Sequence, residues 1–151
     1  EEFKNSSVSA VDKSLEALKV ATQNAKRIGV SNIAFFEGSW YEPFMTAHAD
    51  ENKFDIIVSN PPYIDPNDPH LAGLTDEPIS ALIADNKGMA DICHIVKTAP
   101  QFLQPHGLLA IEHGYDQGEQ VRGVFLSNGF DEVITVKDYG NNERVTLGVL
   151  N

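Results

Sequence analysis

An apolar run followed, after the single residue Asn60, by two prolines does most to limit how this chain of 151 residues can fold. The run Phe54–Ser59 (FDIIVS) holds three consecutive β-branched residues, which predicts a strand buried on both faces of a largely parallel sheet. Pro61 and Pro62 have fixed φ angles and no N–H to donate, so neither can continue a hydrogen-bonded ladder. We therefore expect the strand to end at Ser59 and a stiff loop to begin at Asn60.

Strand and helix patterns alternate along the rest of the chain. We expect strands at residues 7–11, 33–36, 108–112, 133–136 and 144–150, and helices at residues 14–28, 89–103 and 117–128. Ser14 can cap the first helix, and Gly29 can end it. The alternation, closed by two adjacent strands, predicts a single α/β domain over residues 1–151, with a mainly parallel sheet and an antiparallel end.

Charge excludes one class of partner. The chain has 11 basic and 22 acidic residues, a net charge of −11. Duplex DNA binding draws most of its affinity from Lys and Arg on phosphates, so we expect no direct nucleic-acid binding. A basic protein or a small neutral ligand is compatible with this surface. The single cysteine, Cys93, fits a reducing compartment, and no apolar run is long enough for a membrane span, so we expect a cytoplasmic protein.

The types of the residues directly after the apolar run indicate what kind of ligand they could bind. Ligands of open α/β sheets lie beyond the carboxyl ends of strands, which is where Asn60–Tyr63 falls. The Asn60 side-chain oxygen and the Pro61 main-chain oxygen can each accept one N–H of a planar –NH2 group, while the Tyr63 ring covers its plane. This tetrapeptide predicts a site for a primary amide or an exocyclic base amine. The simpler alternative is a proline-stiffened loop with no ligand.

Longer stretches resemble a known family. SNPPYI, with Asp12 and Trp40 upstream and DYGNNERVTLG downstream, resembles the PrmC/HemK protein-glutamine N5-methyltransferases from about Val8 to Val149. Asn-Pro-Pro-Tyr alone is shared with enzymes that methylate DNA amino groups. The release-factor family is favoured by four further stretches: DPHL (68–71), EPISALIA (77–84), GMADI (88–92) and EHG (112–114).

The resemblance implies a fold, a reaction and a set of site residues. The fold is a Rossmann-like class I methyltransferase sheet, and the cofactor is S-adenosylmethionine. The reaction methylates the glutamine of the Gly-Gly-Gln motif in class I peptide chain release factors, a protein modification that belongs to translation termination. Asp12 would bind the cofactor ribose, and Trp40 would stack in the adenine pocket. The resemblance assigns catalysis to Asn60, Pro61 and Tyr63, cofactor binding to Asp12, Trp40 and Asn60, and substrate binding to Asn60, Pro61, Pro62 and Tyr63, with no metal.

Two of these assignments have simpler alternatives. Asp12 can be a solvated residue ahead of a helix, and Trp40 can be a core residue. We also expect Glu112 and His113 to be structural, although a lining role is open to them at the end of their strand. Arg144 is expected to anchor the last strand.

The chain departs from the family pattern in two places. None of its eleven glycines forms a Gly-x-Gly pair, and only eleven residues precede Asp12. We therefore expect a sheet that lacks the family's first strand and glycine-rich loop, with two facing edges unpaired. We also expect this part alone to be inactive and to bind cofactor weakly. Ser39 stands where many relatives carry Asp, which weakens the expected adenine contact.

Two other functions stay open. The first is a DNA or RNA amino-methyltransferase, which must extract its base from the stack. The second is an inactive fragment that acts at most as a binding module.

Overall fold

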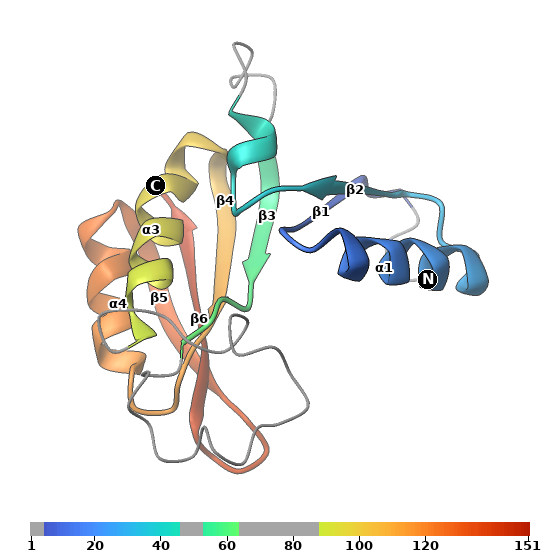
Figure 1. The fold of residues 1–151 in the computed structure, drawn as a ribbon. Coiled ribbons are helices and arrows are strands. Elements are labelled where there is room, and N and C mark those ends of the chain that lie inside the picture. The colour runs from blue at the N-terminus through green and yellow to red at the C-terminus, as the bar shows by residue number, and fades with distance from the viewer. Residues whose placement is uncertain (1–4, 46–52, 64–87) are drawn as a thin grey trace. The chain divides into compact units, whose positions relative to one another are not determined.

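The computed structural model describes residues 5–45, 53–63 and 88–151. It divides the chain into two compact units, Glu1–Ala49 and Asp50–Asn151, which we call the N-terminal and C-terminal units (Figure 1). The stretches DPHL and EPISALIA lie outside the described residues. No helix in the described ranges is long and apolar enough to cross a membrane.

The N-terminal unit contains a two-stranded parallel sheet and one α-helix. In the register of this sheet Val8 lies opposite Ile33 and Asp12 opposite Glu37, so both strands end at the same edge. The elements in chain order are β1 (Val8–Asp12), α1 (Leu15–Ile28), β2 (Ile33–Glu37) and the short 3-10 helix η1 (Glu42–Phe44).

Local signals define α1. The Ser14 hydroxyl accepts the N–H of Ala17 at 3.2 Å, which caps the first turn. Gly29 adopts a left-handed conformation with φ of 76° and donates its N–H to the carbonyls of the last turn. The expected start and end of this helix are confirmed. The helix has no buried residue.

The C-terminal unit contains a four-stranded sheet in the order β3-β4-β6-β5. β3 and β4 are parallel, and β6 is antiparallel to both of its neighbours. A mainly parallel sheet with an antiparallel end was predicted; the antiparallel end is confirmed, whereas only one of the three strand pairings in this sheet is parallel. The elements are β3 (Phe54–Ser59), α3 (Ala90–Thr98), the 3-10 helix η5 (Ala99–Gln101), β4 (Leu103–Glu112), α4 (Gly118–Ser127), β5 (Phe130–Lys137) and β6 (Glu143–Leu150).

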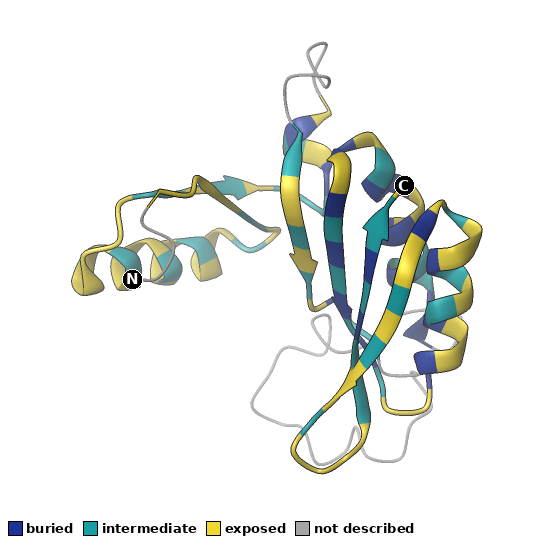
Figure 2. Ribbon diagram, turned by 180° about the vertical axis from the view of Figure 1, so that it is seen from behind, coloured by how far each residue is buried: buried dark blue, intermediate teal, exposed yellow. Residues whose placement is uncertain are grey.

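The core of this unit lies between one face of the sheet and the helices α3 and α4 (Figures 1 and 2). Leu109 and Ile111 of β4 are fully buried, whereas Ala110 between them is only half-buried. Alternate residues of a strand point to opposite faces, so the helices cover one face of β4. The buried helical residues that meet this face include Ile92, Ile95, Val96, Val121 and Phe125.

The prediction that Phe54–Ser59 is buried on both faces is wrong. Ile56 is 57% exposed and Val58 is 74% exposed. β3 is an edge strand of its sheet, and α3 and α4 pack on the other face. Consecutive β-branched residues fit a buried strand, but composition alone does not say how many faces are covered.

The described strands form two sheets, of two and four strands, rather than one. The expectation that the sheet lacks the family's first strand and glycine-rich loop stays a prediction.

Candidate active site

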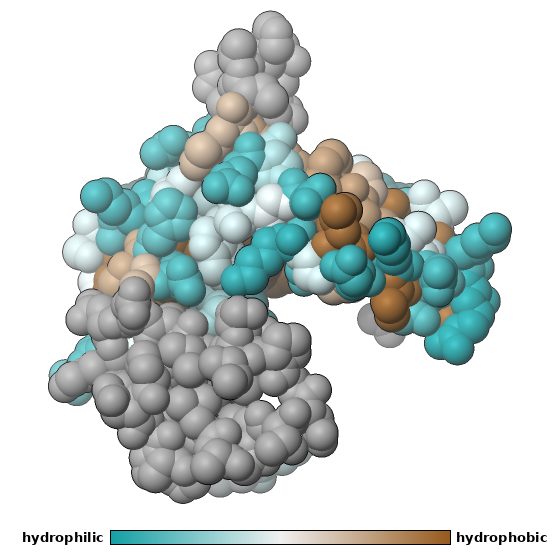
Figure 3. Space-filling view, viewed as in Figure 1, coloured by the Kyte–Doolittle hydropathy of each residue, from teal (hydrophilic) through white to brown (hydrophobic). Residues whose placement is uncertain are grey.

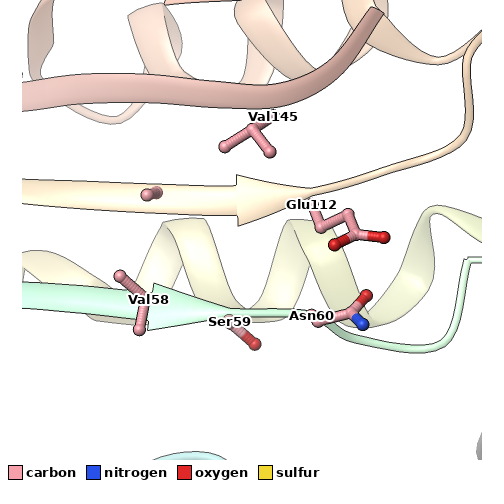
Figure 4. A pocket seen from close by; sticks show the side chains of 6 residues that line it. Val58, Ser59, Asn60, Glu112 and Val145 are labelled. Atoms are coloured by element: carbon pink, nitrogen blue, oxygen red, sulfur yellow. The ribbon is translucent and has the colours of Figure 1, made fainter. Parts of the chain in front are cut away.

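The loop Asn60–Tyr63 begins at the carboxyl end of β3. Ser59 lies opposite Ile111 in the parallel register, so Asn60 lies beside Glu112 at the end of β4. Figure 4 shows the Asn60 carboxamide and the Glu112 carboxylate projecting from these adjacent strand ends. Asn60 is exposed, Pro61 is buried, and Tyr63 is half-buried. The predicted amide-binding group is therefore accessible while its loop is anchored.

An open pocket of about 310 Å³ extends from these strand ends onto the sheet (Figure 4). Its apolar surface comes from Val58, Ala110 and Val145. Ser59, Asn60 and Glu112 supply its polar groups. The pocket is open to solvent and combines three apolar with three polar residues.

The hydroxyl and the main-chain oxygen of Tyr63 are both hydrogen-bonded. Its hydroxyl donates to Glu112 Oε1 at 3.2 Å, and its main-chain oxygen accepts the Gln117 Nε2–H at 3.0 Å. The pKa of the Tyr63 phenol is raised, first because burial disfavours the phenolate and next because the Glu112 carboxylate lies beside it. Tyr63 thus stays a neutral phenol with its hydroxyl directed at Glu112.

His113 lies directly after Glu112 and is fully buried. Its Nδ1 lies 2.8 Å from the Gly114 oxygen, and because a carbonyl only accepts, Nδ1 carries the proton. Burial lowers the pKa of His113, which favours the neutral ring, so Nε2 accepts from the Thr146 hydroxyl at 2.9 Å. His113 is therefore placed within the core.

Further polar contacts complete this network. Thr146 pairs with Thr135 at 2.9 Å, and Thr135 accepts from Arg122 at 2.8 Å. Arg144 donates to the His113 oxygen at 3.3 Å and pairs with Asp138 at 3.3 Å. Arg144 therefore joins the start of β6 to the chain just after β4.

Asp12 is exposed at the end of β1. Its Oδ1 accepts the Ser14 N–H at 2.7 Å, and its Oδ2 has no hydrogen-bond partner within the described ranges. One oxygen thus serves the helix start, as the simpler alternative proposed, and the other is available for a ligand.

Trp40 lies in the turn that follows β2. It is half-buried and adopts a φ of 52°. The turn is fixed by the Ser39 N–H, which donates to Glu42 Oε2 at 2.8 Å, and by the Gly38 N–H, which donates to the Asp12 oxygen at 3.2 Å. The structure thus brings Asp12 and this turn to one edge of the N-terminal unit.

Sequence reasoning missed two residues at the Asn60–Tyr63 loop and underrated a third. Gln117 and Gly88 both lie against the Tyr63 main chain. Glu112 was expected to be structural, but it lines the pocket. Its place was readable, because it ends the strand next to β3 just as Asn60 follows β3. Gln117 carries no such signal, since it lies 54 residues from its partner.

The chain is similar to known methyltransferases. A family model described as "Methyltransferase domain" matches residues 1–139. The release factor glutamine methyltransferase of Yersinia pestis is 46% identical over 149 residues, which cover 97% of this chain and 52% of the relative. The enzyme of the same name from Escherichia coli is 43% identical over 141 residues, with 92% and 49% covered. The chain therefore spans about half the length of these relatives.

Solved structures show the same fold. A methyltransferase from Pyrococcus furiosus aligns with a TM-score of 0.68 at 19% identity, covering 99% of this chain and 65% of its own. The protein-(glutamine-N5) methyltransferase (release factor-specific) from Alicyclobacillus acidocaldarius aligns at 0.55 and 20% identity, covering 98% and 83%. At such identities the likeness establishes the class I methyltransferase fold.

Proposed function

We propose, from the premise that this chain belongs to the methyltransferase domain family, that residues 1–151 form part of the catalytic domain of a protein-glutamine methyltransferase. The proposed substrate is the Gly-Gly-Gln glutamine of class I peptide chain release factors. The observation that carries the proposal is the 46% identity to a release factor glutamine methyltransferase over 97% of this chain. The proposed location is the cytoplasm, where release factors act.

The substrate side of the site rests on Asn60, Pro61 and Tyr63, with Pro62 stiffening the loop. Within the described ranges, neither the Asn60 carboxamide nor the Pro61 oxygen has a hydrogen-bond partner. These two oxygens suit the two N–H groups of a primary amide. The Tyr63 ring suits the flat face of the amide, and its hydroxyl is engaged by Glu112.

The cofactor side rests on Asp12, Trp40 and Asn60, and the proposed cofactor is S-adenosylmethionine. The available Asp12 oxygen fits a ribose hydroxyl, and the half-buried Trp40 ring fits adenine stacking. Asn60, exposed at the end of β3, fits a group that touches both cofactor and substrate. Bound S-adenosylmethionine supplies an electrophilic methyl group to the reaction.

The site acts mainly by positioning. An amide nitrogen is a poor nucleophile because its lone pair is delocalised into the carbonyl. By accepting both N–H groups, Asn60 and Pro61 orient the nitrogen so that its lone pair faces the methyl group. Such positioning can remove roughly 7–11 kcal/mol of a barrier. The proton leaves the nitrogen after transfer, so no base has to remove it first.

Charge favours a protein substrate over a nucleic acid. A net charge of −11 opposes the binding of a polyanion to the chain as a whole. An inactive binding module is the remaining alternative, and it predicts no transfer at all.

The test is transfer of radiolabelled methyl by the full natural chain. We expect label in a class I release factor and in a Gly-Gly-Gln peptide, and none when that glutamine is replaced by alanine. DNA and RNA should remain unlabelled. Label in oligonucleotides in preference to protein would establish the nucleic-acid alternative, and no label in any substrate would overturn the proposed methyltransferase activity.

A further inference from the structure

Tyr63 is held at both ends by side chains from distant parts of the C-terminal unit. Glu112, the last residue of β4, accepts its hydroxyl at 3.2 Å. Gln117, the residue before α4, donates to its main-chain oxygen at 3.0 Å. No regular secondary structure includes Asn60–Tyr63, so these side chains fix the position of Tyr63.

The Gln117 side chain is itself held in one orientation. It is only 7% exposed, and its Oε1 accepts the Gly114 N–H at 2.8 Å. Because the amide oxygen only accepts and the amide nitrogen only donates, this contact directs Nε2 toward the Tyr63 oxygen. Gly114 is fixed in turn, because its oxygen accepts from the buried His113 ring and from the Gln117 main chain. The donor aimed at Tyr63 is therefore preorganised.

Gly88 makes room for this contact. A Cβ at this position would overlap the Tyr63 carbonyl and lie 2.7 Å from Gln117 Nε2. The residue also has a φ of 76°, in the left-handed region that favours glycine. Close packing against Gly88 thus limits the movement of the Tyr63 carbonyl from a second side.

We propose that Gln117 and Glu112 are positioning residues for methyl transfer, which hold Tyr63 and through it set the geometry of the Asn60 and Pro61 oxygens that receive the substrate amide. The inference rests on the proposed function. It also assigns the Tyr63 hydroxyl to Glu112, so Tyr63 presents its ring face, and not its hydroxyl, to the substrate.

The decisive variant is Gln117→Glu in the full natural chain. It keeps the size of the side chain and an acceptor for Gly114, but replaces the donor facing Tyr63 by an oxygen. At pH 8 we expect kcat to fall between about tenfold and 100-fold. A displacement of the substrate-binding groups by about 1 Å can lower a rate by this much. The KM for S-adenosylmethionine should change little. Gln120→Glu, on the exposed face of α4, is the matched control.

A pH profile separates positioning from a general loss of stability. A protonated carboxyl group can again donate to the Tyr63 oxygen. The ratio of variant to wild-type kcat should therefore rise as the pH is lowered from 8 to 5.5, while Gln120→Glu keeps a constant ratio. A variant ratio near 1 at every pH, or a reduced ratio that does not change with pH, would overturn the role of Gln117.

A double-mutant cycle tests Glu112 without altering Gln117. Tyr63→Phe and Glu112→Leu remove the donor and the acceptor of one hydrogen bond, so the double variant should lose little more kcat than either single variant. Strictly additive losses would overturn the pairing. If the wild-type protein transfers no methyl group to release factors, the proposed function fails and a phenol titration tests the pairing. In that case Glu112→Gln should lower the pKa of the transition that Tyr63→Phe abolishes, and an unchanged pKa would overturn it.

Discussion

The two units of the chain are both built from alternating strands and helices, but they differ in what holds them together. All the fully buried large side chains in the described ranges belong to the C-terminal unit, among them Phe102, Phe125 and Phe130. In the N-terminal unit, α1 buries no residue and leaves Val20 57% and Ile28 69% exposed. Figure 3 shows apolar side chains on the surface over α1. The same sequence alternation therefore accompanies two very different degrees of burial.

This difference bears on the proposed site. The substrate loop Asn60–Tyr63 is attached to the well-packed unit and is held there by Glu112 and Gln117. Asp12 and Trp40, the proposed cofactor residues, belong to the lightly packed unit. Sites keep their geometry when packing fixes the residues that support them. We therefore expect the substrate side to be the more preorganised of the two.

The largest expected effect is the loss of a core aromatic ring. Phe125 is fully buried and its ring packs 5.1 Å from that of Phe130. Phe125→Ala should lower the free energy of unfolding by about 3–5 kcal/mol. Phe35→Ala, on the half-buried β2, should cost less than half as much. Urea unfolding of the two variants measures the difference, and equal losses would show that both units are packed alike.

Asn60→Ala should have the next largest effect, and on activity instead of stability. Removal of one of the two oxygens that hold the substrate amide should lower kcat by about 100-fold or more. Asn60 is exposed, so the melting temperature should stay close to that of the wild type. Near wild-type methylation of a Gly-Gly-Gln peptide by this variant would remove Asn60 from the mechanism.

His113 should make the stability of the C-terminal unit depend on pH. Burial holds the pKa of His113 below its ordinary value of 6.5, so the unfolded chain binds a proton that the folded chain does not. Stability should therefore fall as the pH is lowered below about 6.5 and reach its full value above it. His113→Gln should cost about 1–3 kcal/mol at pH 8, because buried partners lose hydrogen bonds.

Hydrogen exchange measured per residue locates this effect. Residues 5–45 contain no histidine, so exchange in β1, α1 and β2 should not follow the titration of His113. In His113→Gln, the part of the pH dependence below about 6.5 that belongs to this residue should disappear. An unchanged pH dependence in the variant would show that His113 is not the group responsible.

Much of the fold could be predicted because local signals mark the ends of its elements. The cap at Ser14, the left-handed Gly29 and the prolines after Ser59 all act within a few residues of the boundary that they set. β4 and β5 were predicted too short. The described β4 runs from Leu103, and the added residues include Gly107 and Pro105, which are poor predictors of a strand.

The candidate site, like the fold, could be predicted only where neighbouring residues determine the structure. Asn60–Tyr63 could be found because two prolines and an amide directly follow an apolar strand. Glu112 could have been placed beside this loop, because it ends the strand next to β3. Gln117 could not, because it lies 54 residues from Tyr63 and reaches it only through tertiary packing. The exposure of Val58 was also unpredictable from its own run, since it depends on which face the helices cover.

The smallest expected effect tests the N-terminal unit. Ser14→Ala removes the hydroxyl that accepts the Ala17 N–H and should cost about 1 kcal/mol. Because α1 buries no residue, this loss should appear as faster hydrogen exchange in the first turns of α1, with exchange in β4 and β6 unchanged. Ser127→Ala, at the exposed end of α4, is the matched control. Equal acceleration of exchange in β4 would mean that the two units unfold together. The units would then differ in how many residues they bury but not in their stability.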